Sequence, residues 1–163
     1  MTTQNIDALT ITRIFDAPRE IVWKAWTDAE TFKKWWGPKD YTSTVCNIDL
    51  RVNGYYHSNI VAPDGQVLIW SRGTYLELIP NEHIVCTDSF SDEEGNIVPA
   101  SDYGMSGEWS QELKIILDFE DVESGKTKMT LNHIGLPEGE MKDMCRDGWQ
   151  QSFDKLDNLL KGM

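Results

Sequence analysis

The chain has 163 residues, a formal net charge of −12 and seven tryptophans. This length predicts a single domain, residues 1–163, and the acidic charge argues against binding to nucleic acid or to anionic membrane surfaces. No apolar run approaches the ~20 residues of a membrane span, the N-terminus does not resemble a secretory signal, and the three cysteines are widely spaced. We therefore expect a cytoplasmic protein without a disulfide framework.

The first 40 residues predict one strand followed by two short helices. Residues 9–15 alternate in polarity, which is typical of a strand. Asp16 lies where a helix N-cap is expected, and Pro18 suits the first helical turn. Thr27 and Asp28 end this helix and cap a second one, which is expected at residues 29–35.

From Tyr41 the apolar period changes to two, which is typical of strands. The expected strands are residues 43–50, 55–61, 66–79, 83–90, 109–120 and 126–134. Tight-turn signals such as Asn53-Gly54 separate them, so neighbouring strands should be antiparallel. Gly73 lies inside a long strand and predicts a bulge or a sharp bend. The polar stretch 91–107 is expected to be a long loop, either a lid or a disordered segment.

Residues 138–161 predict a long helix with one apolar stripe. The stripe consists of Met141, Cys145, Trp149, Phe153, Leu156 and Leu160. Such a helix needs a broad partner, and most of the remaining chain is predicted to be strands. We therefore predict an α+β fold, in which a curved antiparallel sheet of six or seven strands wraps around the C-terminal helix and two short helices lie between strands one and two. This shape tends to leave a cavity between sheet and helix.

Several motifs carry a resemblance to a known family. The segment FDAPREIVWKAWTD at residues 15–28, with WWGP at residues 35–38, closely resembles the opening of the activator-of-heat-shock-protein-90-ATPase-like family. DLRVNG at residues 49–54 resembles its second signature, although Asn53 stands where the family usually has glycine; RGTYLE at 72–77 and Gly148-Trp149 match later landmarks. The family belongs to the START-like (SRPBCC), Bet v 1-like helix-grip superfamily, so the resemblance implies a seven- or six-stranded sheet gripping the last helix. It implies function much less, because members range from apolar-ligand carriers to cyclases and ring-hydroxylase components.

Strand parity and the helix stripe select candidate residues for a ligand pocket. They are Tyr56, Trp70, Arg72, Asp88, Trp109, Gln111, His133, Met144, Trp149 and Phe153. A buried arginine needs an acidic partner or an anionic ligand, and Asp88 on the next strand is a candidate partner for Arg72. The same residues could instead fill a core. A bulge at Gly73 would shift the strand by one residue, so the sequence leaves open which face of the sheet carries Trp70 and Arg72.

The sequence lacks the local motifs of common catalytic and metal sites. It contains no GxSxG, no CxxC and no phosphate-binding glycine loop, and its three histidines do not have metal-ligand spacing. We therefore expect neither a metal nor a cofactor. His133 shares its strand face with Met129 and Leu131, where it could bind a ligand, transfer a proton or simply be hydrogen-bonded at a strand end.

Three functions are compatible with these patterns. The first is binding of a small apolar or amphipathic molecule in the cavity, under the 91–107 loop as a lid. The second is an enzyme that uses the same cavity for acid/base chemistry with His133, Asp88 or Tyr56. The third is a chaperone-linked interaction module, for which the exposure of Trp35 and Trp36 is the feature to check. A homodimer through an edge strand or through that tryptophan pair is also possible.

Overall fold

One antiparallel sheet of seven strands organises the protein. The computed structural model describes residues 8–105, 107, 109, 110 and 112–162. The strand order is β1-β7-β6-β5-β4-β3-β2. The strands are β1 (Leu9–Phe15), β2 (Cys46–Ile48), β3 (Tyr55–Val61), β4 (Val67–Ile79), β5 (His83–Ser91), β6 (Leu113–Val122) and β7 (Lys126–Ile134). The predicted class and sheet are thereby confirmed.

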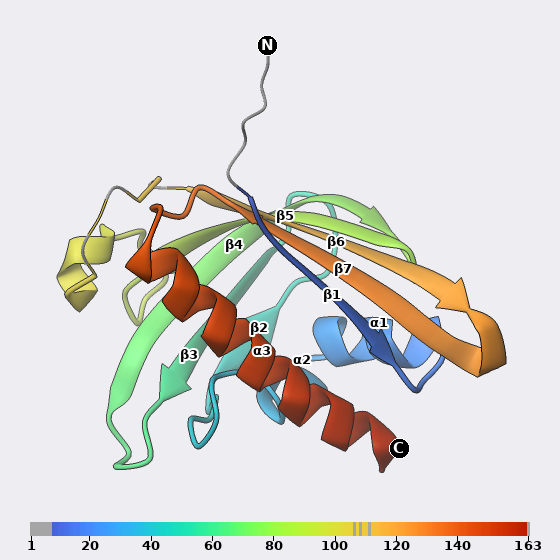
Figure 1. The fold of residues 1–163 in the computed structure, drawn as a ribbon. Helices are drawn as coiled ribbons and strands as arrows, with labels where there is room; N and C mark the ends of the chain where they lie inside the picture. The colour runs from blue at the N-terminus through green and yellow to red at the C-terminus, as the bar shows by residue number, and fades with distance from the viewer. Residues whose placement is uncertain (1–7, 106, 108, 111, 163) are drawn as a thin grey trace.

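The long helix α3 (Glu140–Lys161) runs across the concave face of this sheet, as the predicted helix-grip fold requires (Figure 1). The short helices α1 (Arg19–Thr27) and α2 (Ala29–Lys33) lie between β1 and β2. Asp28 caps α2 as expected, since its carboxylate accepts a hydrogen bond from the Thr31 amide at 3.0 Å. The predicted cap at Asp16 is wrong, because α1 starts after Pro18 without a side-chain capping bond.

Two of the predicted strands have different limits in the structure. The strand expected at residues 43–50 is reduced to Cys46–Ile48, and the one expected from residue 109 begins at Leu113. In place of a continuous ladder, the residues before β2 are held by side-chain bonds and an isolated bridge. Asn59 Oδ1 accepts hydrogen bonds from the amides of Thr44 and Val45 at 2.9 and 3.1 Å, and Thr42 forms a bridge with Val61. An alternating polarity pattern cannot distinguish these two ways of pairing the backbone.

The apolar stripe of α3 packs on aromatic residues from the N-terminal third of the chain. Phe153 is fully buried, and its ring lies 6.3 Å from that of Phe15 and 6.1 Å from that of Trp26. Burial of one such side chain contributes about 1.5–3 kcal/mol relative to exposure. The C-terminal half of α3 is therefore anchored in a filled core, while its N-terminal half is left to line the space described below.

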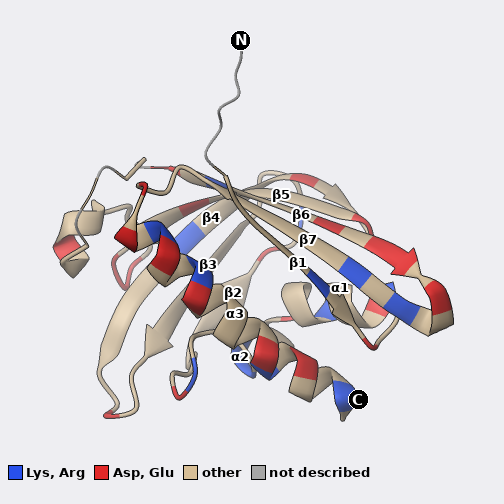
Figure 2. Cartoon of the chain, in the orientation of Figure 1, with Lys and Arg blue, Asp and Glu red and all other residues tan. Residues whose placement is uncertain are grey.

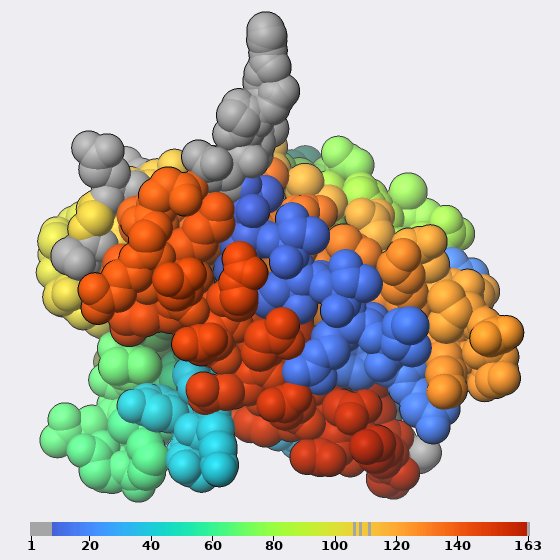
Figure 3. All heavy atoms as spheres, viewed as in Figure 1, coloured from blue at the N-terminus to red at the C-terminus, as the bar shows by residue number. Residues whose placement is uncertain are grey.

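Charged residues lie mostly on the outer surface. Figure 2 shows acidic positions on α3, on β6 and in the connecting turns, so the acidic residues are spread along the chain. In Figure 3 the atoms of α3 and β1 form a continuous surface over the visible face. Within the described part of the chain, no helix has the length and apolar character that crossing a membrane requires.

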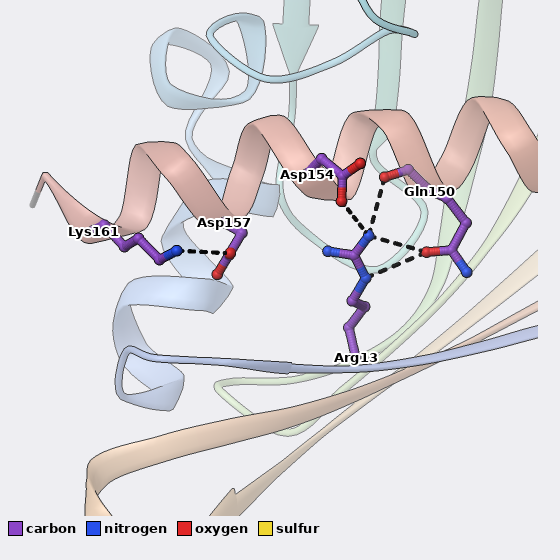
Figure 4. A network of polar contacts seen from close by, with 5 residues as sticks. All are labelled: Arg13, Gln150, Asp154, Asp157 and Lys161. Atoms are coloured by element: carbon purple, nitrogen blue, oxygen red, sulfur yellow. Dashed lines mark hydrogen bonds and ion pairs between the residues drawn. The ribbon is translucent and has the colours of Figure 1, made fainter.

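Arg13 on β1 fixes the position of α3 along the sheet. Its guanidinium donates to Asp154 Oδ1 at 2.6 Å, to Gln150 Oε1 at 3.1 Å and to the Gln150 carbonyl at 3.2 Å (Figure 4). Its Nε also donates to Gln150 Oε1 at 3.3 Å. Four bonds from one planar group define both the distance and the rotation of the helix. The same view shows the ion pair of Asp157 and Lys161 along α3, which lies within the helix and ties it to no other element.

The stretch 91–107, expected to be a lid or disordered, contains local structure. Ser91 forms an isolated bridge with Ile97, and the Asp92 carboxylate accepts hydrogen bonds from the Asn96 amide and side chain at 2.8 and 3.0 Å. A short 3-10 helix, η1 (Ala100–Tyr103), follows, and the Tyr103 hydroxyl donates to the Ser91 carbonyl. These bonds fold the described part of the loop back onto the end of β5.

Candidate ligand pocket

A hollow of about 200 Å³ lies between the concave face of the sheet and the N-terminal half of α3. Its wall is largely apolar, and strands β3, β4, β5 and β6 contribute together with the helix. Representative side chains are Ile60, Ile69, Phe90, Leu113, Met141 and Trp149. A second hollow of about 40 Å³ adjoins it deeper in the core, among residues such as Cys46, Tyr75 and Cys86.

Two tryptophan rings stand between the two hollows. Trp36 and Trp149 line both of them, and their ring centroids are 5.0 Å apart in an edge-to-face arrangement. Trp35 points the other way: it is fully buried and its indole N–H donates to the Ala25 carbonyl at 2.9 Å. The buried indole nitrogen of Trp36 has no hydrogen-bond partner among the described residues. The WWGP motif therefore supplies one core residue and one wall residue.

A chain of hydrogen bonds crosses the wall that the hollows share. Tyr56 donates its hydroxyl to Asp88 Oδ1 at 2.7 Å, and His133 Nε2 lies 3.1 Å from Asp88 Oδ2. On the other side of the imidazole, Trp149 Nε1 lies 3.1 Å from His133 Nδ1. Since an indole nitrogen can only donate, Nδ1 must accept, and the proton of neutral His133 is on Nε2. Each oxygen of the Asp88 carboxylate then accepts one hydrogen bond.

The protonation states of the neighbouring groups follow from their burial. Desolvation, followed by the negative charge of Asp88, raises the pKa of Tyr56 well above its ordinary value, so the phenol keeps its proton. Burial also raises the pKa of the Cys145 thiol, at the edge of the hollow, to about 11. A thiol with this pKa is a packing group rather than a nucleophile near neutral pH.

Gly73 makes the contact between Tyr56 and Asp88 possible. Tyr56 on β3 pairs with Gly73 on β4, and the register that pairs Arg72 with Ser89 places Gly73 opposite Asp88 on β5. A Cβ atom at Gly73 would lie 2.3 Å from Tyr56 Cε2 and 1.9 Å from the Thr87 carbonyl oxygen. The tyrosine ring therefore crosses β4 over a position where only glycine fits.

The predicted bulge at Gly73 is wrong. The ladder from β3 to β4 runs in register through Gly73, and the irregularity between β4 and β5 lies further along, between Tyr75 and Glu77. A second irregularity lies between Ile60 and Val61 on β3. A glycine within a strand marks either a bulge or the close approach of another group, and here it marks the close approach.

The structure brings together some of the predicted pocket residues and separates others. Asp88, Trp109, His133, Met144 and Trp149 line the larger hollow, and Tyr56 lines the smaller one with Asp88 and Trp149. Phe153 belongs to the filled core. Gln111 lies outside the described residues. Met144 is 52% exposed, so it lies at the rim rather than inside.

Trp70 and Arg72 lie on the opposite, convex face of the sheet. Trp70 stacks on the His57 ring at 4.9 Å, and Arg72 donates to the Gly95 carbonyl at 2.9 Å. The predicted pairing of Arg72 with Asp88 is therefore wrong. Arg72 pairs in register with Ser89, and Asp88 is the next residue along β5, so its side chain points to the other face.

Sequence reasoning assigned two wall residues of α3 only to packing. Met141 and Cys145 lie on the apolar stripe, but the structure places them over the hollow instead of over the sheet core. Their place in the stripe could have identified them, because the first two turns of the helix precede the aromatic residues that fill the core around Phe153. Among the described residues, no group of three or more histidine, cysteine, aspartate or glutamate side chains is arranged to hold a metal ion.

Comparison with known proteins identifies relatives over nearly the whole chain. The family model described as Activator of Hsp90 ATPase homolog 1-like protein matches residues 16–161. No curated protein matches the chain. The structure is similar to that of a protein from Chromobacterium violaceum, with 27% identity, a TM-score of 0.77 and coverage of 94% of this chain and 96% of that one.

Two further solved structures show the same arrangement. A solution structure from Staphylococcus epidermidis shares 25% identity at a TM-score of 0.75, covering 98% of this chain and 93% of that one. The AHSA1 protein from Silicibacter pomeroyi shares 22% identity at a TM-score of 0.73, with 94% and 97% of the chains covered. The last of these likenesses concerns the fold alone.

Proposed function

The chain belongs to the family of Activator of Hsp90 ATPase homolog 1-like proteins, and on that premise we propose that it binds a small apolar or amphipathic molecule between the sheet and α3. The observation that supports this function best is the hollow of about 200 Å³ with its largely apolar wall. A concave, mostly apolar site with a few convergent polar groups is the usual form of a small-molecule site. The polar cluster in this wall that is centred on Asp88 would orient the bound molecule.

The position of the hollow suggests how a ligand would be covered. Met105 near the end of the 91–107 loop and Trp109 just after it line the hollow together with Met141 and Met144 of α3. The Trp109 ring also packs edge-to-face on Phe90 at 5.2 Å. Methionine side chains adapt to ligands of different shape at low cost. The loop and the first turns of α3 would therefore close over the ligand together.

Displacement of a fluorescent apolar dye by a panel of lipids and polyketides tests this proposal. Cys145→Trp places a large side chain in the hollow and should abolish dye binding, whereas the matched variant Cys145→Ser keeps the volume and should bind as the wild type does. Native mass spectrometry of the same samples checks the stoichiometry. Dye binding that is equally strong in the Cys145→Trp variant would contradict a site in this hollow.

A second candidate function is acid/base catalysis in the same hollow, favoured by the hydrogen-bonded set Tyr56, Asp88 and His133. Both imidazole nitrogens are already engaged and the phenol donates to Asp88. The carboxylate is more basic than the phenol oxygen and keeps free acceptor positions, so Asp88 would be the base. The test is solvent deuterium incorporation into enolisable ketones by wild type and by Asp88→Asn. Exchange that does not depend on Asp88 would exclude this role.

A chaperone-linked role is the third candidate, since the family description names an activator of Hsp90 ATPase. The surface feature expected for it is weak: Trp35 is fully buried and Trp36 is partly buried in the wall of the hollow. Pulldown with Hsp90, together with ATPase turnover in the presence of the chain, tests it. Lack of both binding and stimulation would contradict the chaperone-linked role.

A further inference from the structure

Asp88 places a carboxylate in a largely apolar wall. Its side chain is 21% exposed, and its two hydrogen-bond donors are the Tyr56 hydroxyl and the neutral imidazole of His133. The described residues that line the two hollows include no lysine and no arginine. A partly buried carboxylate without a countercharge is unfavourable by itself.

The carboxylate also has acceptor capacity left. Its two oxygens offer about four lone-pair positions, and the two hydrogen bonds use one on each oxygen. Asp88 lines both hollows, so a molecule that occupies either of them meets the carboxylate. The group that would complete this site is a hydrogen-bond donor, and a positively charged one would also compensate the charge.

The surrounding rings favour a cation as well. Trp36 and Trp149 line both hollows beside Asp88, and Trp109 lines the larger one. The faces of indole rings attract organic cations, with an energy that increases when water is excluded. The net charge of −12 raises the local concentration of cations around the whole molecule.

We infer that the hollow selects an apolar molecule that carries one protonated amine, with the ammonium group on Asp88 and the apolar body among the indole rings. This inference rests on the proposed function, since it names the chemical class of the ligand for the same hollow. An ammonium group has three donors and no acceptor, and Asp88 supplies the matching charge. A ligand with a carboxylate in the same place would be repelled.

Three probes with the same naphthalene body test the inference: naphthylethylamine, naphthylethanol and naphthylacetate. Their dissociation constants for the full chain are measured by isothermal titration calorimetry at neutral pH. The amine should bind about tenfold or more tightly than the alcohol, because a hydrogen bond between charged groups exceeds a neutral one by this factor. The acetate should bind most weakly.

Two variants separate the charge from the shape of the site. Asp88→Asn should remove the preference, so that amine and alcohol bind within about threefold of each other. Tyr56→Phe removes one donor to Asp88 but keeps the carboxylate, so the preference for the amine should persist. Equal binding of amine and alcohol to the wild type would overturn the inference and leave apolar binding intact. Absence of binding for all three probes would overturn both.

Discussion

Replacement of Gly73 by alanine tests the contact on which the polar wall depends. The added methyl group would lie 1.9 Å from the Thr87 carbonyl oxygen and 2.3 Å from Tyr56 Cε2. One of these neighbours is backbone of β5, and the other is a ring that is held by its hydrogen bond to Asp88. Neither can move away without loss, so β4 must separate from β5 or the tyrosine ring must leave its position.

The expected loss of stability has two parts. Forcing a methylene-sized group into a packed region costs about 1–3 kcal/mol. Breaking the hydrogen bond between Tyr56 and the charged carboxylate of Asp88 costs a further ~1.5–3 kcal/mol. We therefore expect Gly73→Ala to lower the free energy of unfolding by about 2.5–6 kcal/mol, a large part of the ~5–15 kcal/mol that a domain usually has.

Equilibrium unfolding in urea, followed by tryptophan fluorescence, measures this loss. Gly148→Ala is the matched control, because a Cβ at this helical position meets only Pro38 Cγ, at 3.9 Å. Alanine in the interior of α3 should raise the free energy of unfolding by about 0.5–1 kcal/mol. The two glycine-to-alanine changes should thus have opposite signs.

A double-mutant cycle separates the two parts of the Gly73 effect. In a Tyr56→Ala background the ring and its hydrogen bond are already absent, so Gly73→Ala should cost less there by about 1.5–3 kcal/mol. The clash with the Thr87 carbonyl remains in both backgrounds. A Gly73→Ala protein within about 0.5 kcal/mol of the wild type would refute the close approach described here.

Three further predictions concern other parts of the fold. Burial raises the pKa of Cys46 to about 12, so iodoacetamide at about pH 8 should modify it only after unfolding; rapid labelling of the native protein, read by mass spectrometry, would contradict this. The hydrogen bond to Asp118 raises the pKa of His83 above 6.5, so its stabilisation should be complete below pH 6.5 and be lost as the pH rises through the folded-state value, and His83→Gln should flatten this part of the stability-pH profile. Arg13→Met removes the bonds to Gln150 and Asp154, and should lower the free energy of unfolding by about 1–3 kcal/mol; an unchanged thermal midpoint would argue against this anchor.

Local patterns in the sequence were sufficient to predict the fold. The apolar stripe of α3 and the alternation in β6 and β7 depend only on residues a few positions apart, because one buried face imposes a period of 3.6 or 2. Turn signals such as Asn53-Gly54 then require antiparallel neighbours. These patterns also identified His133 and Trp149 as inward-facing, and the structure places both in the wall of the hollow.

Register was the part that local patterns could not supply. The facing of Arg72 depends on whether a bulge precedes it, and the irregularity of β4 lies beyond Tyr75 instead of at Gly73. A shift by one residue exchanges the two faces of a strand. For this reason the predicted pair of Arg72 and Asp88 was wrong, although Asp88, named as a pocket candidate, lines the hollow.

The polar wall is a product of strand order rather than of any motif. Tyr56, Asp88 and His133 lie on β3, β5 and β7, which are alternate strands of the sheet. Alternate strands are about 9.5 Å apart, so only long side chains can meet a short carboxylate between them. The tyrosine also needs the missing side chain at Gly73 to cross β4. A local motif cannot encode such a set, because its members are far apart in the sequence. The register of the strands brings them together, with the carboxylate of Asp88 between the two longer side chains. Asp88 is therefore the group that a ligand would meet.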